Sequence, residues 1–137
     1  MLKKTITYID YNGLERTEDF YFNLTKSEIV KTEMTTDGGY GELLNRIAKA
    51  KNAPEIMRQF ERIIKMSYGE RSDDGRRFIK SPEISDAFAQ TPAYDELFYE
   101  LCTDADSAAK FVNGILPEDM KKKDSEVIDF ARNQLGK

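Results

Sequence analysis

The segment that most constrains the fold is Pro54–Tyr68, which predicts a long amphipathic core helix. Pro54 suits a first helical turn because its missing N–H would have no intrahelical partner there. Gly69 follows the last apolar residue, and we expect it to cap the helix in a left-handed conformation. A stripe of apolar side chains recurs at helical spacing, at roughly 100° per residue, and would face a core: Ile56, Met57, Phe60, Ile63, Ile64 and Tyr68.

The N-terminal region predicts a β-hairpin. Two strand-like runs, residues 5–9 and 15–24, flank an Asn12-Gly13 pair. Asn-Gly favours a two-residue type I′ turn because both residues tolerate positive φ. An isolated hairpin is marginally stable in water, so this one must pack on helices or join another sheet edge, which hints at a partner. Side chains two residues apart share a face, which gives one apolar face: Ile6, Tyr8, Phe20, Phe22 and Leu24.

The rest of the chain carries several helix signals. Thr25–Glu28 matches a capping box for a helix through about Met34, and residues 43–52 predict a second helix. The turn at Asp74-Gly75 would return Phe78 and Ile79 to the body. Three further helix starts combine a capping side chain with Pro or an acid in the first turn: Ser81-Pro82, Thr91-Pro92 and Thr103 with Asp106.

These elements predict a single α+β domain over residues 1–117. It would comprise the hairpin (5–24) and a mainly helical body (25–117), with about six helices in all. Residues 118–137 differ in composition and predict a charged linker followed by a short amphipathic helix or a mobile tail. At 137 residues the chain is long enough to bury a core without disulfide or metal support.

Charge and composition exclude several function classes. The net charge is −4 with acids and bases interleaved, which argues against a nucleic-acid binder. No apolar run approaches the ~18 residues of a membrane span, and no signal peptide is recognisable. One cysteine, Cys102, excludes an internal disulfide framework and favours a reducing cytoplasm.

We expect no enzyme, cofactor or metal site. The chain has no histidine, so Cys102 lacks the usual activating base and is expected to be a buried structural residue. Asp73-Asp74-Gly75 does not match the spacing of a calcium loop and predicts a solvated turn. The glycine-rich segment 37–41 lacks the Lys-Ser/Thr of a phosphate-binding loop.

Four phrases within residues 5–117 carry a family resemblance: NGLERTEDFYFNL, DGRRFIKS, TPAYDELFYEL and FVNGILP. The chain resembles the tail assembly chaperones of long-tailed phages and prophages. The resemblance implies a non-catalytic protein in the cytoplasm of the bacterial host. It would bind the tape-measure protein, keep it soluble and bring tail-tube subunits to it.

Several aromatic side chains are candidates for partner binding, because aromatic residues supply large contact areas. The alternative for each is an ordinary place in the core. Two other functions stay open: a structural phage component retained in the virion (neck, tube or head–tail joining protein), and a small prophage-encoded regulator. A homo-oligomer is also open. The candidate residues are Phe20, Phe22, Tyr40, Tyr94, Phe98 and Tyr99.

Overall fold

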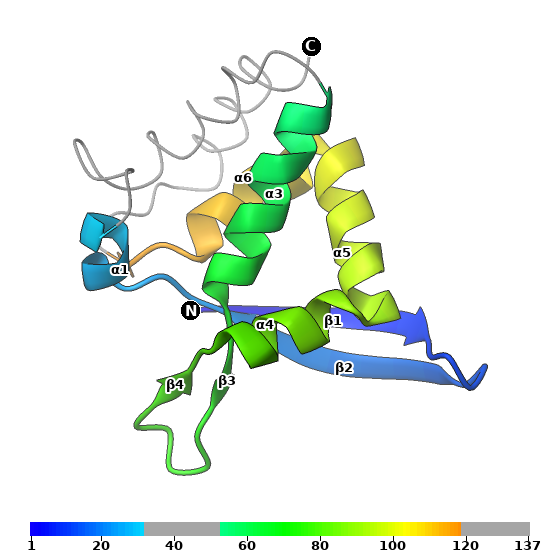
Figure 1. Ribbon diagram of the computed structural model, residues 1–137, viewed down its shortest axis with the longest axis horizontal. Helices are drawn as coiled ribbons and strands as arrows, with labels where there is room; N and C mark the ends of the chain where they lie inside the picture. Colours follow the sequence, from blue (N-terminus) through cyan, green and yellow to red (C-terminus); the bar gives the residue numbers. More distant parts are fainter. Residues whose placement is uncertain (32–52, 119–137) are drawn as a thin grey trace.

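The computed structural model describes residues 1–31 and 53–118. These residues form a four-stranded antiparallel sheet of order β1-β2-β3-β4, with α3, α5 and α6 on one side of β1 and β2 (Figure 1). The expected α+β architecture with an N-terminal hairpin is thereby confirmed. In chain order the elements are β1 (Leu2–Ile9), β2 (Glu15–Phe22), α1 (Lys26–Lys31), α3 (Ala53–Ser67), β3 (Tyr68–Arg71), β4 (Phe78–Ile79), α4 (Pro82–Ala89), α5 (Pro92–Thr103) and α6 (Ala105–Gly114).

Two of the expected segments fall outside the described residues. They are the helix at residues 43–52 and the amphipathic stretch within 119–137. The described part of the chain contains five helices, consistent with a mainly helical body after the hairpin.

The hairpin turn differs from the expected type I′ geometry. The Asp10 N–H donates to the Leu14 carbonyl (2.8 Å) and the Gly13 N–H to the Asp10 carbonyl (2.9 Å), which is a three-residue loop with a G1 bulge. Gly13 has φ +81°, whereas no non-glycine residue in the described part has positive φ. The Asp10 carboxylate accepts the N–H groups of Asn12 and Leu14, both at 2.9 Å, and so stabilises the wider loop.

The end of α3 corrects a second expectation. The helix ends at Ser67, whose hydroxyl donates to the Ile63 carbonyl (2.7 Å), and Tyr68 enters β3 directly. Gly69 does not have positive φ, so it is not a left-handed cap. A Cβ at this position would lie 2.7 Å from Phe78 Cε2 and 2.9 Å from the Ile79 carbonyl oxygen. Glycine is required here because β3 and β4 pack closely.

Strands β3 and β4 were not anticipated as strands, although the turn between them was. The Asp74 carboxylate accepts hydrogen bonds from Ser72 Oγ (2.7 Å) and the Arg76 N–H (3.0 Å), and Gly75 adopts φ +74°. The resulting short hairpin projects from the body (Figure 1). It pairs with β2 only at Tyr21–Gly69 and Phe22–Tyr68, so most of β2 has no described strand beside it on that side.

The expected helix caps are confirmed except for one. The Thr25 hydroxyl accepts the Glu28 N–H (3.1 Å) while Glu28 Oε1 accepts the Thr25 N–H (2.9 Å), which is the predicted capping box. Ser81 caps α4 and Thr91 caps α5 as expected. The cap of α6 is Asp104 rather than Thr103. A carboxylate is a good acceptor at this position, and Thr103 still belongs to α5.

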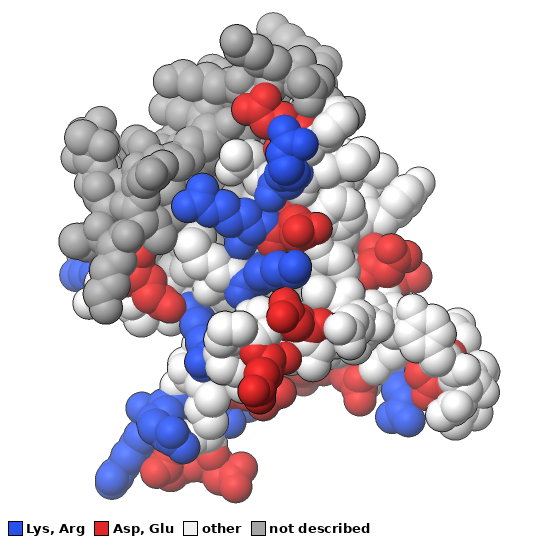
Figure 2. Space-filling view, in the orientation of Figure 1, with Lys and Arg blue, Asp and Glu red and all other residues white. Residues whose placement is uncertain are grey.

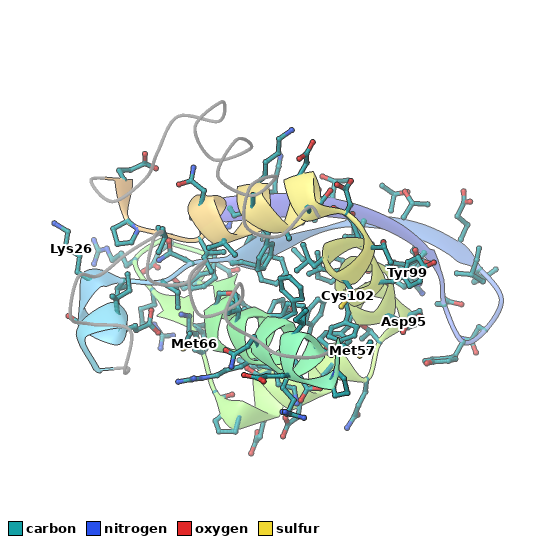
Figure 3. The ribbon with its side chains drawn as sticks, turned by 90° about the horizontal axis from the view of Figure 1, so that it is seen from above. Lys26, Met57, Met66, Asp95, Tyr99 and Cys102 are labelled. Carbon is teal, nitrogen blue, oxygen red and sulfur yellow. The ribbon has the colours of Figure 1, made fainter. Side chains whose placement is uncertain are left out.

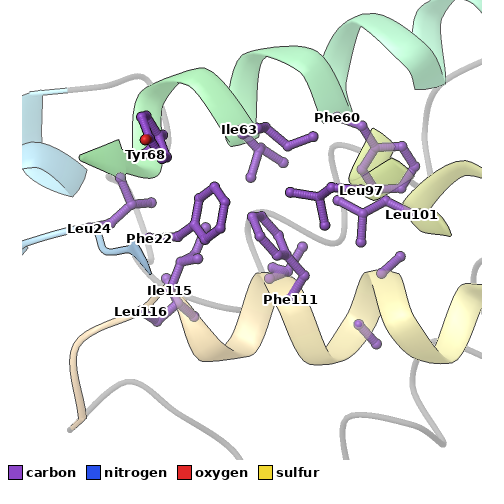
Figure 4. Packing of buried hydrophobic residues seen from close by; sticks show 14 of the residues in the cluster. Phe22, Leu24, Phe60, Ile63, Tyr68, Leu97, Leu101, Phe111, Ile115 and Leu116 are labelled. Carbon is purple, nitrogen blue, oxygen red and sulfur yellow. The ribbon is translucent and has the colours of Figure 1, made fainter. Parts of the chain in front are cut away.

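The hydrophobic core lies between the sheet and α3, α4, α5 and α6 (Figure 4). Phe22 is fully buried, with its ring centroid 5.1 Å from that of Phe111 and 5.6 Å from that of Tyr68. Leu24, which follows β2, is joined to the end of α6, because its N–H donates to the carbonyl of the C-cap residue Ile115 (2.7 Å). The amphipathic stripe of α3 supplies Phe60, Ile63 and Ile64 to the same core, as predicted. Met57 was expected in this stripe but is 46% exposed, because it lies in the first turns of α3 at the margin of the core.

Candidate partner-binding surfaces

The six aromatic candidates are not gathered on one surface. Phe22 lies in the core with no exposed area, and Tyr40 falls outside the described residues. Tyr94 and Phe98 stack on each other, with ring centroids 5.8 Å apart, and pack half-buried against the core. The remaining two, Phe20 and Tyr99, reach separate surfaces.

Phe20 forms part of a groove between β2, β3 and α4, which we call the β2–α4 groove. It consists of two adjoining hollows of about 340 Å³ each, which share Phe20, Tyr68 and Glu70. The groove exists because β3 leaves β2 after only two residue pairs. Its lining comprises Glu18, Asp19, Phe20, Tyr21, Tyr68, Gly69, Glu70, Arg71, Glu83, Ile84, Ala87, Phe88 and Thr91.

The floor of the β2–α4 groove is aromatic. The Phe88 ring stacks on Tyr68 (centroids 4.1 Å apart, 11° between planes) and tilts against Phe20 (5.2 Å). Burial raises the pKa of Tyr68 to about 12, and the nearby charges of Glu70 and Glu18 act in the same direction. The phenol therefore stays neutral at physiological pH. The floor offers apolar contact area with fixed ring positions.

The rim of the groove is acidic. Its lining holds four acids and one arginine, a formal net charge of −3: Glu18, Asp19, Glu70, Glu83 and Arg71. Arg71 is held against β2, since its Nη2 donates to the Tyr21 hydroxyl (3.0 Å) and its guanidinium carbon lies 4.1 Å from the centroid of that ring. Figure 2 shows acidic side chains over α4, whereas basic and acidic side chains alternate over α3. An apolar partner with flanking Lys or Arg residues would match this groove.

Tyr99 lies on a second surface, beside the outer strand of the sheet. It is 69% exposed and projects from α5 toward the hairpin (Figure 3). A hollow of about 220 Å³ separates α5 from β1 there, and we call it the β1–α5 hollow. It is lined by Thr5, Ile6, Thr7, Glu96, Leu97, Tyr99 and Glu100.

The hairpin tip carries further apolar side chains that sequence reasoning did not select. Ile9 is 55%, Tyr11 85% and Leu14 59% exposed. The tip extends past the helices, so nothing in the described part covers it (Figure 1). A signal for them was present in the sequence. These three large apolar residues lie in or next to a turn, where polar residues are usual.

No group of three or more Cys, Asp or Glu side chains among the described residues is placed to hold a metal ion. Cys102 is half-buried against the core, less enclosed than expected, and burial raises the pKa of its thiol. None of the described helices has the length and apolar character of a membrane span.

The described residues define a small α+β protein with a groove between β2 and α4 and a hollow between β1 and α5. A family model described as phage tail assembly chaperone matches residues 1–134. The chain therefore belongs to the phage tail assembly chaperone family, which confirms the resemblance found in its sequence. No curated protein and no solved structure matches the chain.

Proposed function

We propose that this protein binds the tape-measure protein in the cytoplasm of the bacterial host, keeps it soluble, and helps tail-tube subunits assemble around it. It would act by reversible binding without catalysing a reaction. Membership of the tail assembly chaperone family supports this role. The structural observation that carries it is the β2–α4 groove, with an aromatic floor and an acidic rim.

The groove suits the chemistry expected of such a client. A long helical protein exposes apolar stripes until the tail tube encloses it, and those stripes would aggregate in water. An amphipathic helix can lay its apolar face into a groove of this kind. Phe20 and Ile84 would contact the stripe, while Glu70 and Glu83 would meet flanking basic residues. The charges would mainly speed the encounter and select the orientation.

The direct test is co-expression with the tape-measure protein encoded in the same phage region, followed by pull-down and a solubility assay. We expect the tape-measure protein to become soluble and to co-purify with this chain. Purified virions should lack the chaperone, as judged by mass spectrometry. If the tape-measure protein stays insoluble and this chain is found in virions, a structural role replaces the proposal. Capture of a host protein without any phage partner would instead favour a regulator.

A further inference from the structure

Strand β1 is an outer strand of the sheet, and no described strand pairs with its outer backbone edge, which we call the open edge. The hydrogen bond from the Asp10 N–H to the Leu14 carbonyl shows that the backbone groups of Asp10 point to β2. In an antiparallel pair every second residue directs its N–H and C=O groups to the neighbouring strand, so the even-numbered residues of β1 do the same. The backbone N–H and C=O groups that point to β2 are therefore those of Leu2, Lys4, Ile6 and Tyr8. The backbone groups of Lys3, Thr5, Thr7 and Ile9 point to the open edge, and no described element outside the hairpin forms a backbone hydrogen bond with them.

This edge carries little of the protection that natural proteins give to exposed edge strands. β1 has eight residues, no proline and a continuous register with β2. Prolines, bulges and inward-pointing charges are the usual means of blocking an edge. One such charge is present, because Lys4 points to the inner face, but it is already neutralised by Glu100 of the same copy. On the outer face of β1, Lys3 is the charged residue at one end, and the exposed side chains of Thr5 and Thr7 occupy the middle. The strand is ready to accept another strand.

The charges around the edge favour a strand with the composition of β1 itself. β1 contains two lysines and no acid, whereas the β1–α5 hollow beside it is lined by Glu96 and Glu100. Lys4 already pairs with Glu100 within one copy (Nζ–Oε2 2.9 Å). Glu96 has no ion-pair partner among the described residues. A second β1 would bring a second Lys4 toward this acidic hollow without placing an acid there.

We propose that two copies of this chain pair through their β1 strands, antiparallel and across a two-fold axis, to form one continuous sheet. A two-fold interface uses the same patch on both copies, which the open edge satisfies. The residues whose backbone groups point to the open edge must lie opposite each other in the two copies, because they form the hydrogen bonds. These residues are odd-numbered, so only registers that pair odd-numbered with odd-numbered positions are allowed. This condition permits two central registers, with the axis beside either Thr5 or Ile6.

The register centred on Ile6 is the better of the two. It places Thr5 opposite the partner's Thr7 and Lys3 opposite the partner's Ile9, so the aliphatic stem of Lys3 covers an isoleucine that is 55% exposed. On the inner face the two Ile6 side chains meet as a non-hydrogen-bonded pair, in which side chains lie closest. No like charges stand directly opposite each other. Centring on Thr5 would leave Ile9 at the end of the paired region, opposite only the first residue of the partner.

The test is the oligomeric state of the full chain alone, measured by sedimentation velocity over a range of concentrations. Wild type should be a dimer. The Thr5→Lys/Thr7→Lys variant places lysine opposite lysine at two positions and should weaken the dimer about tenfold or more. The matched control is Thr17→Lys/Asp19→Lys on β2. It removes the same side-chain bonds, Thr5–Asp19 (2.6 Å) and Thr7–Thr17 (2.9 Å), and adds more positive charge one strand away from the edge.

A charge swap tests the register. In Thr5→Lys/Thr7→Glu each lysine faces the partner's glutamate if Ile6 is central, so the dimer should return to wild-type strength. Circular dichroism of every variant checks that the fold is retained. A monomeric wild type, a dimer that survives the double-lysine change, or equal disruption by the β2 control would overturn the proposal. Because the tape-measure protein is absent, the result does not depend on the proposed chaperone function.

Discussion

Phe20 and Phe22 lie two residues apart on the same face of β2, yet their environments differ. Phe22 is fully buried among aromatic rings, whereas Phe20 stays half-buried at the floor of the β2–α4 groove. Alternation along a strand identifies which side chains share a face. How far each is covered depends on where α4 and α6 cross that face. One of the two is therefore suited to the core and the other to a binding surface.

Replacing Phe22 with alanine should strongly destabilise the protein. The change leaves a cavity beside Tyr68, Phe88 and Phe111, and we expect a loss of about 3–5 kcal/mol in the free energy of unfolding, measured by urea denaturation. Tyr11→Ala serves as the control, because that ring is 85% exposed and its removal should change stability by less than about 0.5 kcal/mol. A loss below about 1 kcal/mol for Phe22→Ala would show that the ring is not enclosed as described.

Gly69→Ala tests the close approach of β3 and β4. The added methyl group would collide with the Phe78 ring and the Ile79 carbonyl, so we expect a loss of about 1–3 kcal/mol in unfolding free energy. If Gly69 were simply a flexible strand residue, alanine would be neutral or stabilising. Thermal unfolding of the variant beside wild type separates the two outcomes.

At the scale of elements, Lys80 joins segments that are distant in sequence. Its ammonium group donates to Glu28 Oε2 (2.7 Å), to the Asn23 carbonyl (2.6 Å) and to the Met66 carbonyl (3.1 Å). It thereby connects the start of α1, the end of β2 and the last turn of α3 to the segment that follows β4. Charged hydrogen bonds to partly buried acceptors contribute more to stability than exposed ion pairs.

Lys80→Met should therefore cost about 2 kcal/mol of unfolding free energy, because it removes the charged donor that the Glu28 carboxylate and two carbonyl groups share. The matched control is Lys65→Met. Its ion pair with Glu61 is exposed and 3.7 Å long, so its loss should cost at most about 0.5 kcal/mol. Equal effects of the two changes in urea denaturation would contradict the connecting role of Lys80.

The same site predicts a pH dependence. Burial alone would raise the pKa of Glu28, but the hydrogen bonds from Lys80 and Thr25 outweigh it and hold the pKa below its ordinary value of 4.5. A lowered pKa in the folded state contributes stability above the unfolded-state pKa, and this is lost as pH falls through the folded-state value. The stability difference between wild type and Glu28→Gln should thus be constant above about pH 5 and shrink in more acid solution. A difference that grows on acidification would contradict this assignment.

At the scale of the whole molecule, the β2–α4 groove and the open β1 edge lie on opposite sides of the hairpin. The groove borders β2, β3 and α4, whereas β1 is the outer strand on the other margin of the sheet. Pairing of two copies through β1 would therefore leave both grooves open. Such a dimer would present two grooves to one long client, and linked sites bind a repetitive partner more tightly than single ones.

Ala87→Arg tests whether the groove binds the tape-measure protein. Ala87 is exposed and lines the groove, so arginine can be accommodated without disturbing the core but fills the space of the client. We expect binding to weaken about tenfold or more, measured by pull-down or interferometry. Asp86→Arg is the control, because Asp86 is the exposed neighbour of Ala87 and does not line the groove. This substitution also changes the net charge by more than Ala87→Arg does. Wild-type binding by both variants would rule out the groove as the interface.

Local signals in the sequence were sufficient to identify most of the elements and the family. The amphipathic stripe of α3, the capping box at Thr25 and the Ser81-Pro82 start of α4 depend on residues within a few positions of one another. Such patterns can be read without a tertiary structure. The G1 bulge, the shift of the α6 cap to Asp104 and the β3–β4 strands were missed, because each depends on competition between nearby alternatives or on pairing with a distant strand.

The sequence by itself determined the α+β class, the hairpin, the main core helix and the tail assembly chaperone family, since periodicity, capping and family phrases are local properties. Only the tertiary structure decided which aromatic residues are accessible. Phe22 belongs to the core because helices far along the chain cover it completely. Phe20 lies at the floor of the groove because those helices cover it only in part. The same holds for the open edge of β1 and the acidic groove at β2, which depend on where the sheet ends and where β3 diverges. Those positions are set by long-range packing, which no local pattern encodes.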